Sequence, residues 1–71
     1  MMLNNSVREL RARFRFTQQD LADRIGVTRQ TIGLIEKGDY APSITLALKI
    51  AHAFDVPVEE IFRLEEERGS C

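Results

Sequence analysis

Residues 18–37 read QQDLADRIGVTRQTIGLIEK, and this stretch decides the fold. It contains two short runs with helical hydrophobic spacing, separated by a turn at Gly26. Thr17 precedes the first run and forms with Asp20 the T-x-x-D pattern of an N-terminal capping box. Gly26 can adopt the left-handed conformation that ends a helix, and Thr28 is suited to cap the second run. The pattern therefore predicts two helices joined by a tight turn.

The side chains within this stretch also meet the packing demands of a helix-turn-helix motif. The two helices of such a motif cross closely, so a small residue is needed at the crossing, and Ala22 occupies that position. No proline interrupts either helix. The apolar residues that would support the second helix from beneath are Leu21, Ile25, Val27, Ile32 and Ile35. We therefore predict a helix-turn-helix motif over residues 18–37.

Three further helices are expected around this motif. Residues 5–15 form the first, with an inner face made of Val7, Leu10 and Phe14. Ser43 caps another, whose broad apolar surface marks it as the buried central helix: Leu46, Ala47, Leu48, Ile50, Ala51 and Phe54. Pro57 suits the start of a short fifth helix, with Glu59 and Glu60 in its first turn. Residues 65–71 are an acidic tail that should fray. Residues 1–71 are thus predicted to form one compact, all-α domain of five helices.

The composition excludes several other classes of protein. The chain has 71 residues, one cysteine (Cys71) and one histidine (His52), so we expect neither an internal disulfide nor a zinc site. No cofactor is expected. There is no apolar run of about 18 residues and no basic region followed by an apolar one at the N-terminus, so we expect no membrane span, no signal peptide and a cytoplasmic location. We expect no enzyme and no small-molecule site, because no nucleophile–base pair or glycine-rich phosphate loop occurs.

Charge is distributed unevenly along the chain. Residues 1–37 contain seven basic and four acidic residues, whereas residues 38–71 contain three basic and seven acidic residues. The first part is therefore better suited to an anionic partner, although mixed charge is also typical of a solvated surface.

The motif and the residues that follow it resemble a known family. The segments QQDLADRIGVTRQTIGLIEKGDYAPS and LALKIAHAFDVPVEEIF are similar to those of the Cro/cI-type (Xre) helix-turn-helix transcription regulators. Residues 5–62 fit the five-helix, lambda-repressor-like pattern of that family, in particular that of its very short, free-standing dimeric repressors. The resemblance implies a homodimer that binds a palindromic operator in double-stranded DNA, with residues 28–36 as the recognition helix in the major groove.

The resemblance also implies roles for individual residues. Gln18 would contact a phosphate, and Arg11 would pair with Glu36 between the first and third helices. It further leaves room for a short two-stranded antiparallel ribbon, in which residues 2–4 pair with residues 63–65.

Helical geometry assigns further roles to the third helix. Recognition helices read bases from their N-terminal turns, so Arg29 and Gln30 are the best-placed readers, for guanine and adenine respectively. Lys37 and the Gly38 amide suit one phosphate, and Tyr40 and Ser43 suit the next. The full set of candidate DNA contacts is Gln18, Thr28, Arg29, Gln30, Thr31, Gly33, Leu34, Lys37, Tyr40 and Ser43.

Two of these positions leave alternatives open. Gly33 either lets the helix approach the bases closely or reads nothing, and glycine weakens a helix there. Leu34 either touches a thymine methyl or is an ordinary exposed leucine.

Assembly and function are predicted together. Ile61, Phe62 and Leu64 form the predicted dimer interface, because the first four helices already supply the core. The predicted function is transcriptional regulation, by repression, through sequence-specific DNA binding. The alternative is a protein-interaction module of the same fold, such as an antitoxin or regulator subunit, but such a module would not need Arg29, Gln30 and Lys37 on one helical face.

Overall fold

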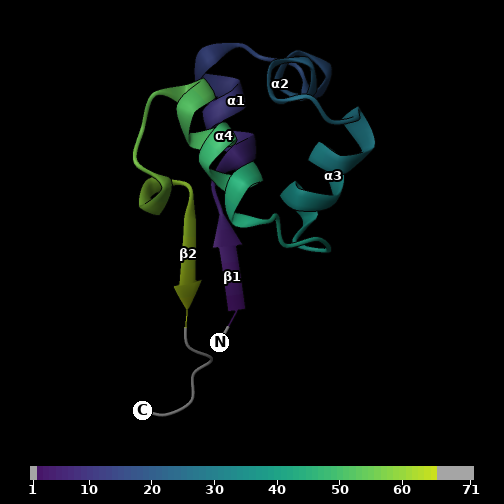
Figure 1. The fold of residues 1–71 in the computed structure, drawn as a ribbon. Coiled ribbons are helices and arrows are strands. Elements are labelled where there is room, and N and C mark those ends of the chain that lie inside the picture. The colour runs from purple at the N-terminus through teal and green to yellow at the C-terminus, as the bar shows by residue number, and fades with distance from the viewer. Residues whose placement is uncertain (1, 66–71) are drawn as a thin grey trace.

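The computed structural model describes residues 2–65, which form four α-helices and a two-stranded sheet (Figure 1). No described helix is long and apolar enough to cross a membrane. The order of the elements is β1 (Met2–Asn5), α1 (Val7–Phe14), α2 (Gln18–Ile25), α3 (Arg29–Lys37), α4 (Ile44–Phe54), the 3₁₀ turn η1 (Val58–Glu60) and β2 (Phe62–Glu65).

Helices α2, α3 and α4 begin at the predicted caps, whereas α1 begins at Val7 and not at residue 5, because Asn5 belongs to β1. The side chains of Thr17, Thr28 and Ser43 each accept a hydrogen bond from the backbone N–H three residues later, which caps α2, α3 and α4. Gly26 and Gly38 end α2 and α3 in the left-handed conformation, with φ values of 79° and 84°. The turn chemistry of the predicted motif is therefore confirmed.

A single hydrophobic core holds these elements together. Ala22 is fully buried between α2 and its neighbours, which permits the close helix crossing that the motif requires. The buried residues come from every helix and from the segment before β2: Val7, Leu10, Leu21, Ala22, Ile25, Ile32, Ile35, Leu46, Ile50, Ala51, Phe54 and Ile61.

Two predicted core residues lie closer to the surface than expected. Phe14 is 44% exposed, and its ring packs at the edge of the core against Phe16 and Phe54, with ring centroids 6.1 and 5.5 Å away. Leu48 is 53% exposed, because α4 packs mainly against α2 and η1 and leaves its remaining side open. The prediction that Leu48 belongs to the broad buried surface of α4 is therefore wrong.

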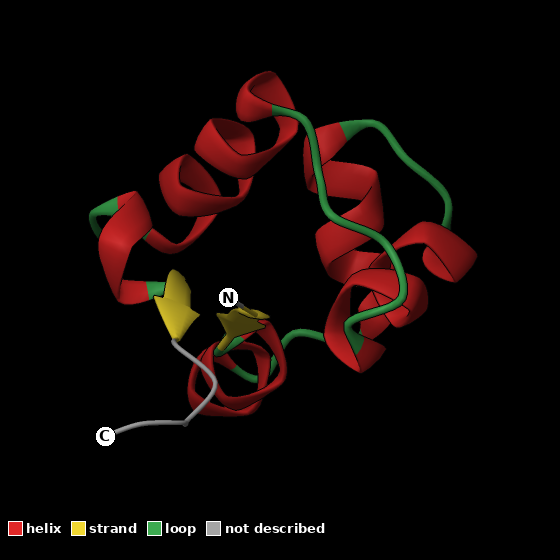
Figure 2. Ribbon diagram, turned by 90° about the horizontal axis from the view of Figure 1, so that it is seen from below, coloured by secondary structure: helices red, strands yellow, loops and turns green. Residues whose placement is uncertain are grey.

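The predicted fifth helix is wrong. Its first residues form only the single 3₁₀ turn η1, and the chain then extends into β2. β2 pairs antiparallel with β1, with Leu3 opposite Leu64 (Figures 1 and 2). This pairing supplies backbone hydrogen bonds that a helix of one or two turns would leave unmade at its ends. The ribbon that the resemblance allowed is present, one residue longer on each strand.

The change from helix to strand also alters the predicted dimer interface. Ile61 is 0% exposed and is part of the core, and its carbonyl accepts a 2.8 Å hydrogen bond from the Ser6 N–H. It therefore offers no side-chain surface to a partner. Phe62 is half-buried against the core, and Leu64 is 67% exposed. The tail at residues 66–71, with Cys71, lies outside the described residues.

The capping box at the start of α2 makes a testable contribution to stability. Hydrogen bonds from the Thr17 amide and hydroxyl lower the pKa of Asp20 from its ordinary value of 3.8, and Arg24 lowers it further. A lowered folded-state pKa means that ionised Asp20 stabilises the fold above its unfolded pKa, and that this stabilisation is lost as the pH falls through the folded value. We expect Asp20→Asn to be less stable than the wild type at neutral pH in urea unfolding, with the difference shrinking below pH 3.8. A difference that stays constant with pH would contradict this role.

Candidate nucleic-acid interface

One side of α3 is turned outward and is polar. Arg29, Gln30 and Lys37 are exposed, and Leu34 is 44% exposed between them. The opposite side carries Ile32 and Ile35, which are both fully buried. The core therefore fixes which side of the helix faces solvent, and it is the side that the sequence predicts.

At the start of α3, two residues use their side chains for the helix cap and two do not. The Thr28 hydroxyl oxygen accepts a hydrogen bond from the Thr31 N–H at 3.2 Å, and the two hydroxyl oxygens lie 3.1 Å apart. Within residues 2–65, the side chains of Arg29 and Gln30 make no hydrogen bond or ion pair. Thr28 and Thr31 therefore hold the turn, while Arg29 and Gln30 are available to a ligand.

An ion pair fixes α3 against α1. The Arg11 Nε donates to Glu36 Oε2 at 2.6 Å, and Arg11 Nη2 donates to Glu36 Oε1 at 3.2 Å. Arg11 Nη1 donates to the Phe16 carbonyl at 3.0 Å. Only 16% of the Arg11 side chain and 7% of the Glu36 side chain are exposed. The pair that the resemblance implied is thus present, and it is bidentate and largely desolvated.

Gln18 connects the start of α2 to the same carboxylate. Its Nε2 donates to Glu36 Oε1 at 3.1 Å. Gln18 also lines an open hollow of about 720 Å³ together with Arg29 of α3 and Arg15, the residue that ends α1. The rest of the hollow is lined by Arg11, Phe16, Thr17 and Gln19.

Arg15 is a candidate contact that the sequence reasoning missed. Its left-handed backbone (φ 62°) ends α1 and brings it to this hollow. Helical periodicity carries no signal for such a turn, because the residue is not glycine. A hollow with several guanidinium groups beside the N-terminal end of α2 is suited to a phosphate.

The predicted phosphate contacts at the exit of α3 are only partly supported. The Gly38 N–H donates to the Ile35 carbonyl at 3.0 Å as part of the helix cap, so the predicted role for this amide is wrong. Lys37 is exposed, and its Nζ lies 3.8 Å from Asp39 Oδ2. Tyr40 is 44% exposed. The Ser43 oxygen accepts from the Leu46 N–H, which leaves its own hydroxyl hydrogen available.

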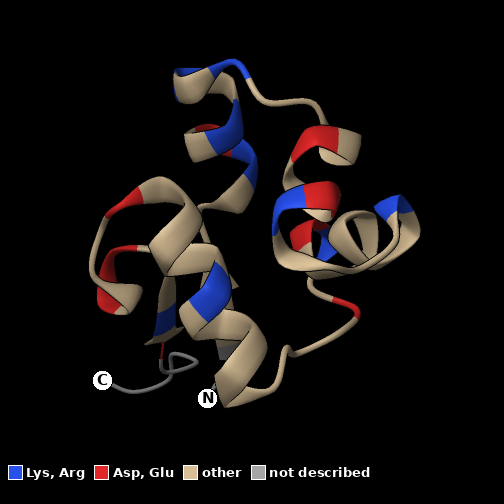
Figure 3. Cartoon of the chain, turned by 45° about the horizontal axis from the view of Figure 1, so that its top comes forward, with Lys and Arg blue, Asp and Glu red and all other residues tan. Residues whose placement is uncertain are grey.

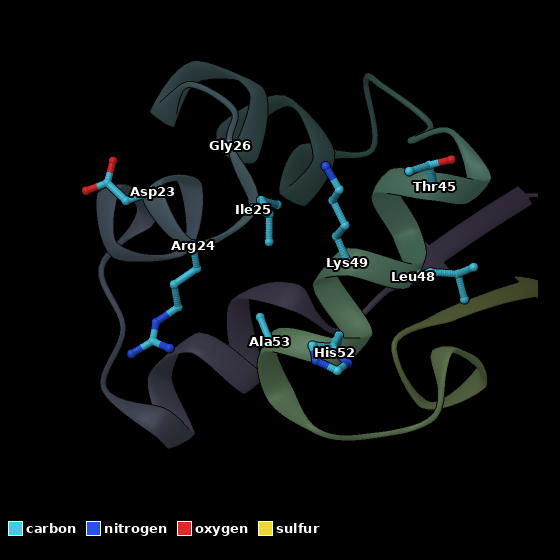
Figure 4. Close-up of a pocket in the computed structure, with 9 residues that line it drawn as sticks. All are labelled: Asp23, Arg24, Ile25, Gly26, Thr45, Leu48, Lys49, His52 and Ala53. Atoms are coloured by element: carbon cyan, nitrogen blue, oxygen red, sulfur yellow. The ribbon is translucent and has the colours of Figure 1, made fainter.

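A larger hollow lies elsewhere, between α2 and α4 (Figure 4). It is open to solvent, has a volume of about 880 Å³, and has Ile25, Leu48 and Ala53 among its lining residues. Arg24 also borders it, but its guanidinium lies 4.4 Å from the centre of the Phe16 ring, and in Figure 4 it extends away from the other lining side chains. Among the described residues, no group of three His, Cys, Asp or Glu side chains could hold a metal ion.

Both signs of charge occur on several elements. Figure 3 shows basic residues along α1 and acidic residues at η1, and it also shows acidic residues beside basic ones on other helices and on the loop before α4. η1 carries Glu59 and Glu60, and it lies on the other side of α4 from α3 in Figure 1. These two glutamates therefore lie away from α3, whereas Asp39 closely follows α3 and Asp20 and Asp23 lie on the neighbouring α2.

A comparison with protein families agrees with this arrangement of helices. The model of a family described as Helix-turn-helix matches residues 7–61, which include all four helices. The chain belongs to the Xre-type helix-turn-helix family. The match ends at Ile61, so it covers η1 but not β2.

Individual members of the family are similar over most of the chain. An uncharacterized HTH-type transcriptional regulator of Bacillus subtilis, YgzD, is 57% identical over 65 residues, which cover 92% of this chain and 98% of that protein. The crystal structure of the restriction-modification controller protein C.AhdI from Aeromonas hydrophila matches with a TM-score of 0.72 and 35% identity, over 76% of this chain and 82% of that one. The cryptic phage CTXphi transcriptional repressor RstR of Vibrio cholerae is 32% identical over 84% of this chain and 54% of its own length.

The family and the fold together establish the general function. This helix-turn-helix protein is a transcriptional regulator with a DNA-binding fold. The predicted motif over residues 18–37 corresponds to α2 and α3, and the predicted recognition helix corresponds to α3 with its cap.

The ion pair beneath the exposed side of α3 should dominate local stability. Glu36→Ala leaves the Arg11 guanidinium unpaired in a largely desolvated position, so we expect a loss of about 3 kcal/mol in the free energy of unfolding. The matched control is Asp39→Ala, which breaks the exposed 3.8 Å pair with Lys37 and should cost less than about 0.5 kcal/mol. Urea unfolding measures both values. Equal losses of unfolding free energy in the two variants would show that the buried pair stabilises the fold no more than the exposed pair does.

Proposed function

We propose that the protein is a sequence-specific repressor that binds a palindromic operator in double-stranded DNA as a homodimer, with α3 in the major groove. The observation that carries this proposal is the common hollow lined by Gln18, Arg15 and Arg29, which joins the start of α2 to the start of α3. A phosphate bound there would bring the first turn of α3 to the edges of the neighbouring base pairs.

The exposed residues then divide into two kinds of contact. Arg29 and Gln30 have unengaged side chains on the first turn of α3, so they read bases by bidentate hydrogen bonds. Gln18, Arg15 and Lys37 contact phosphates, and Tyr40 and the Ser43 hydroxyl contact the next phosphate along the strand. Thr28 and Thr31 hold the first turn of α3 close to the DNA. Leu34 lies beside the readers and suits a thymine methyl.

One relative supports repression as the direction of regulation. RstR, which is similar over 84% of this chain, is named as a transcriptional repressor. A regulator whose operator overlaps a promoter would repress by excluding other proteins from the same DNA.

The dimer interface is proposed on the ribbon. Leu64 is 67% exposed, and its cross-strand partner Leu3 is 37% exposed, so the ribbon carries an apolar pair that nothing covers within residues 2–65. Phe62 lies half-buried at the base of this pair. Burying the same patch from two copies would form the isologous interface that a two-fold axis requires.

DNA reading can be tested at two positions with different expected outcomes. Gln30→Ala should weaken binding to the operator by about 1–3 kcal/mol and relax the preference at one base pair. Lys37→Ala should weaken all sequences alike and reduce the salt dependence by roughly one phosphate contact. The measurement is binding to operator and random duplexes at several salt concentrations, after the operator has been selected from genomic fragments and footprinted.

A Gln30→Ala protein that keeps the parental ratio of operator to random binding would contradict the assignment of this reader. A wild-type protein that selects no DNA at all would contradict the whole proposal.

Assembly can be tested with two charged substitutions of exposed leucines. Leu64→Glu should convert the wild-type dimer to a monomer, because it places a carboxylate in the middle of the apolar patch. The matched control is Leu48→Glu on α4, which should remain dimeric. Sedimentation at micromolar concentration distinguishes the two states. A dimeric Leu64→Glu protein would contradict the ribbon interface, and a monomeric wild type that binds a palindrome tightly would contradict the homodimer.

A protein-interaction module of the same fold is the second candidate. The observation in its favour is the apolar stripe on α4, where Ile44 is 79% exposed and Leu48 is 53% exposed. It would replace the first proposal if genomic selection yields no preferred DNA sequence and Leu48→Glu removes a protein partner.

A further inference from the structure

Gly33 lies on the exposed side of α3, and its neighbour is a side chain from another helix. A Cβ atom placed on Gly33 would meet Gln18 Nε2 at 3.7 Å, which is an ordinary van der Waals contact. Gly33 is not among the positive-φ residues, so its backbone does not require glycine. What the missing side chain provides at this position is space, and Gln18 lies at the edge of that space.

The position of the Gln18 amide is held by hydrogen bonds. Its Nε2 donates to Glu36 Oε1 at 3.1 Å, and Glu36 is itself held by two hydrogen bonds from Arg11. A carboxylate only accepts hydrogen bonds, so the amide must turn its nitrogen toward Glu36. This nitrogen carries two hydrogens, and one of them is used. The second N–H and the amide oxygen have no partner within residues 2–65.

We propose that Gly33 positions Gln18 for its DNA contact: the space beside Gly33 seats the Gln18 amide, so that a side chain from α2 reaches the phosphate at this point of the recognition helix. Arg11 and Glu36 are positioning residues for that contact. The inference rests on the proposed function, because the ligand is the operator DNA, and it resolves the two interpretations of Gly33 that the sequence leaves open. Gly33 itself contacts no base, but its missing side chain leaves room for Gln18 to contact the phosphate.

The size of residue 33 then controls whether Gln18 is used. Alanine adds one carbon at contact distance and leaves the amide in place. Glutamine fills the space with its own longer side chain and displaces the amide from α3. Both substitutions favour the helix relative to glycine, so neither is expected to unfold the protein.

The test measures the effect of Gln18→Ala on the Kd for the selected operator in three backgrounds. We expect about a tenfold loss with Gly33 and with Gly33→Ala, and less than a twofold loss with Gly33→Gln. The matched control is the Leu34→Gln background, which adds a glutamine to the same side of α3 at the next position. There the Gln18→Ala loss should remain about tenfold.

A second readout requires no DNA. In the free protein, hydrogen exchange of the Gln18 side-chain amide, followed by NMR, should be slowed in the wild type and in Gly33→Ala. It should be fast in Gly33→Gln, where the added side chain displaces the Gln18 amide from Glu36.

The possible failures are distinguishable. If the wild type selects no DNA, the proposed function is wrong, and the inference about a DNA contact falls with it. If the wild type binds its operator but Gln18→Ala costs the same factor in all backgrounds, the proposed function stands and the inference is overturned. If the exchange rate of the Gln18 side-chain amide is the same in the wild type and in Gly33→Gln, the inference is also overturned.

Discussion

The arrangement of the helices depends on one ion pair, between Arg11 and Glu36. Arg11 comes from α1 and Glu36 from α3, and the same two side chains also bind the Phe16 carbonyl and the Gln18 amide. Removing these charges from water is costly, and only a full set of hydrogen bonds offsets that cost. Each nitrogen of Arg11 and each carboxylate oxygen of Glu36 has a hydrogen-bond partner in this structure, so the pair ties three helices and one loop into a fixed geometry.

The same contacts serve the fold and the candidate interface. Glu36 lies on the flank of α3 behind the exposed residues, so the pair sets how far the helix is turned, while buried isoleucines set which side is hidden. Gln18 and Arg29 meet at one hollow because α2 and α3 are held at this angle. A substitution beneath the surface would therefore disturb the proposed DNA contacts without touching them, which is typical of a site built on rigid helices.

The parts that could be predicted from the sequence are those fixed by neighbouring residues. The caps at Thr17, Thr28 and Ser43 and the turn at Gly26 depend on contacts over three or four residues, and they were predicted correctly. Residues 57–64 were not, because a short apolar run fits a helix or a strand equally well. The strand forms through pairing with the other end of the chain.

The errors at the candidate site have two causes, the long-range strand pairing and two local helix ends. Burial of Ile61 follows from that long-range pairing, and no local pattern indicates it. Arg15 reaches the hollow through a left-handed turn without glycine, and the Gly38 amide is consumed by a helix cap. The ribbon that caused the first error also has a mechanical consequence. Because it joins residues 2 and 65 side by side, tension applied to these two points would open it one pair at a time, like a zip, before any load reached the helices.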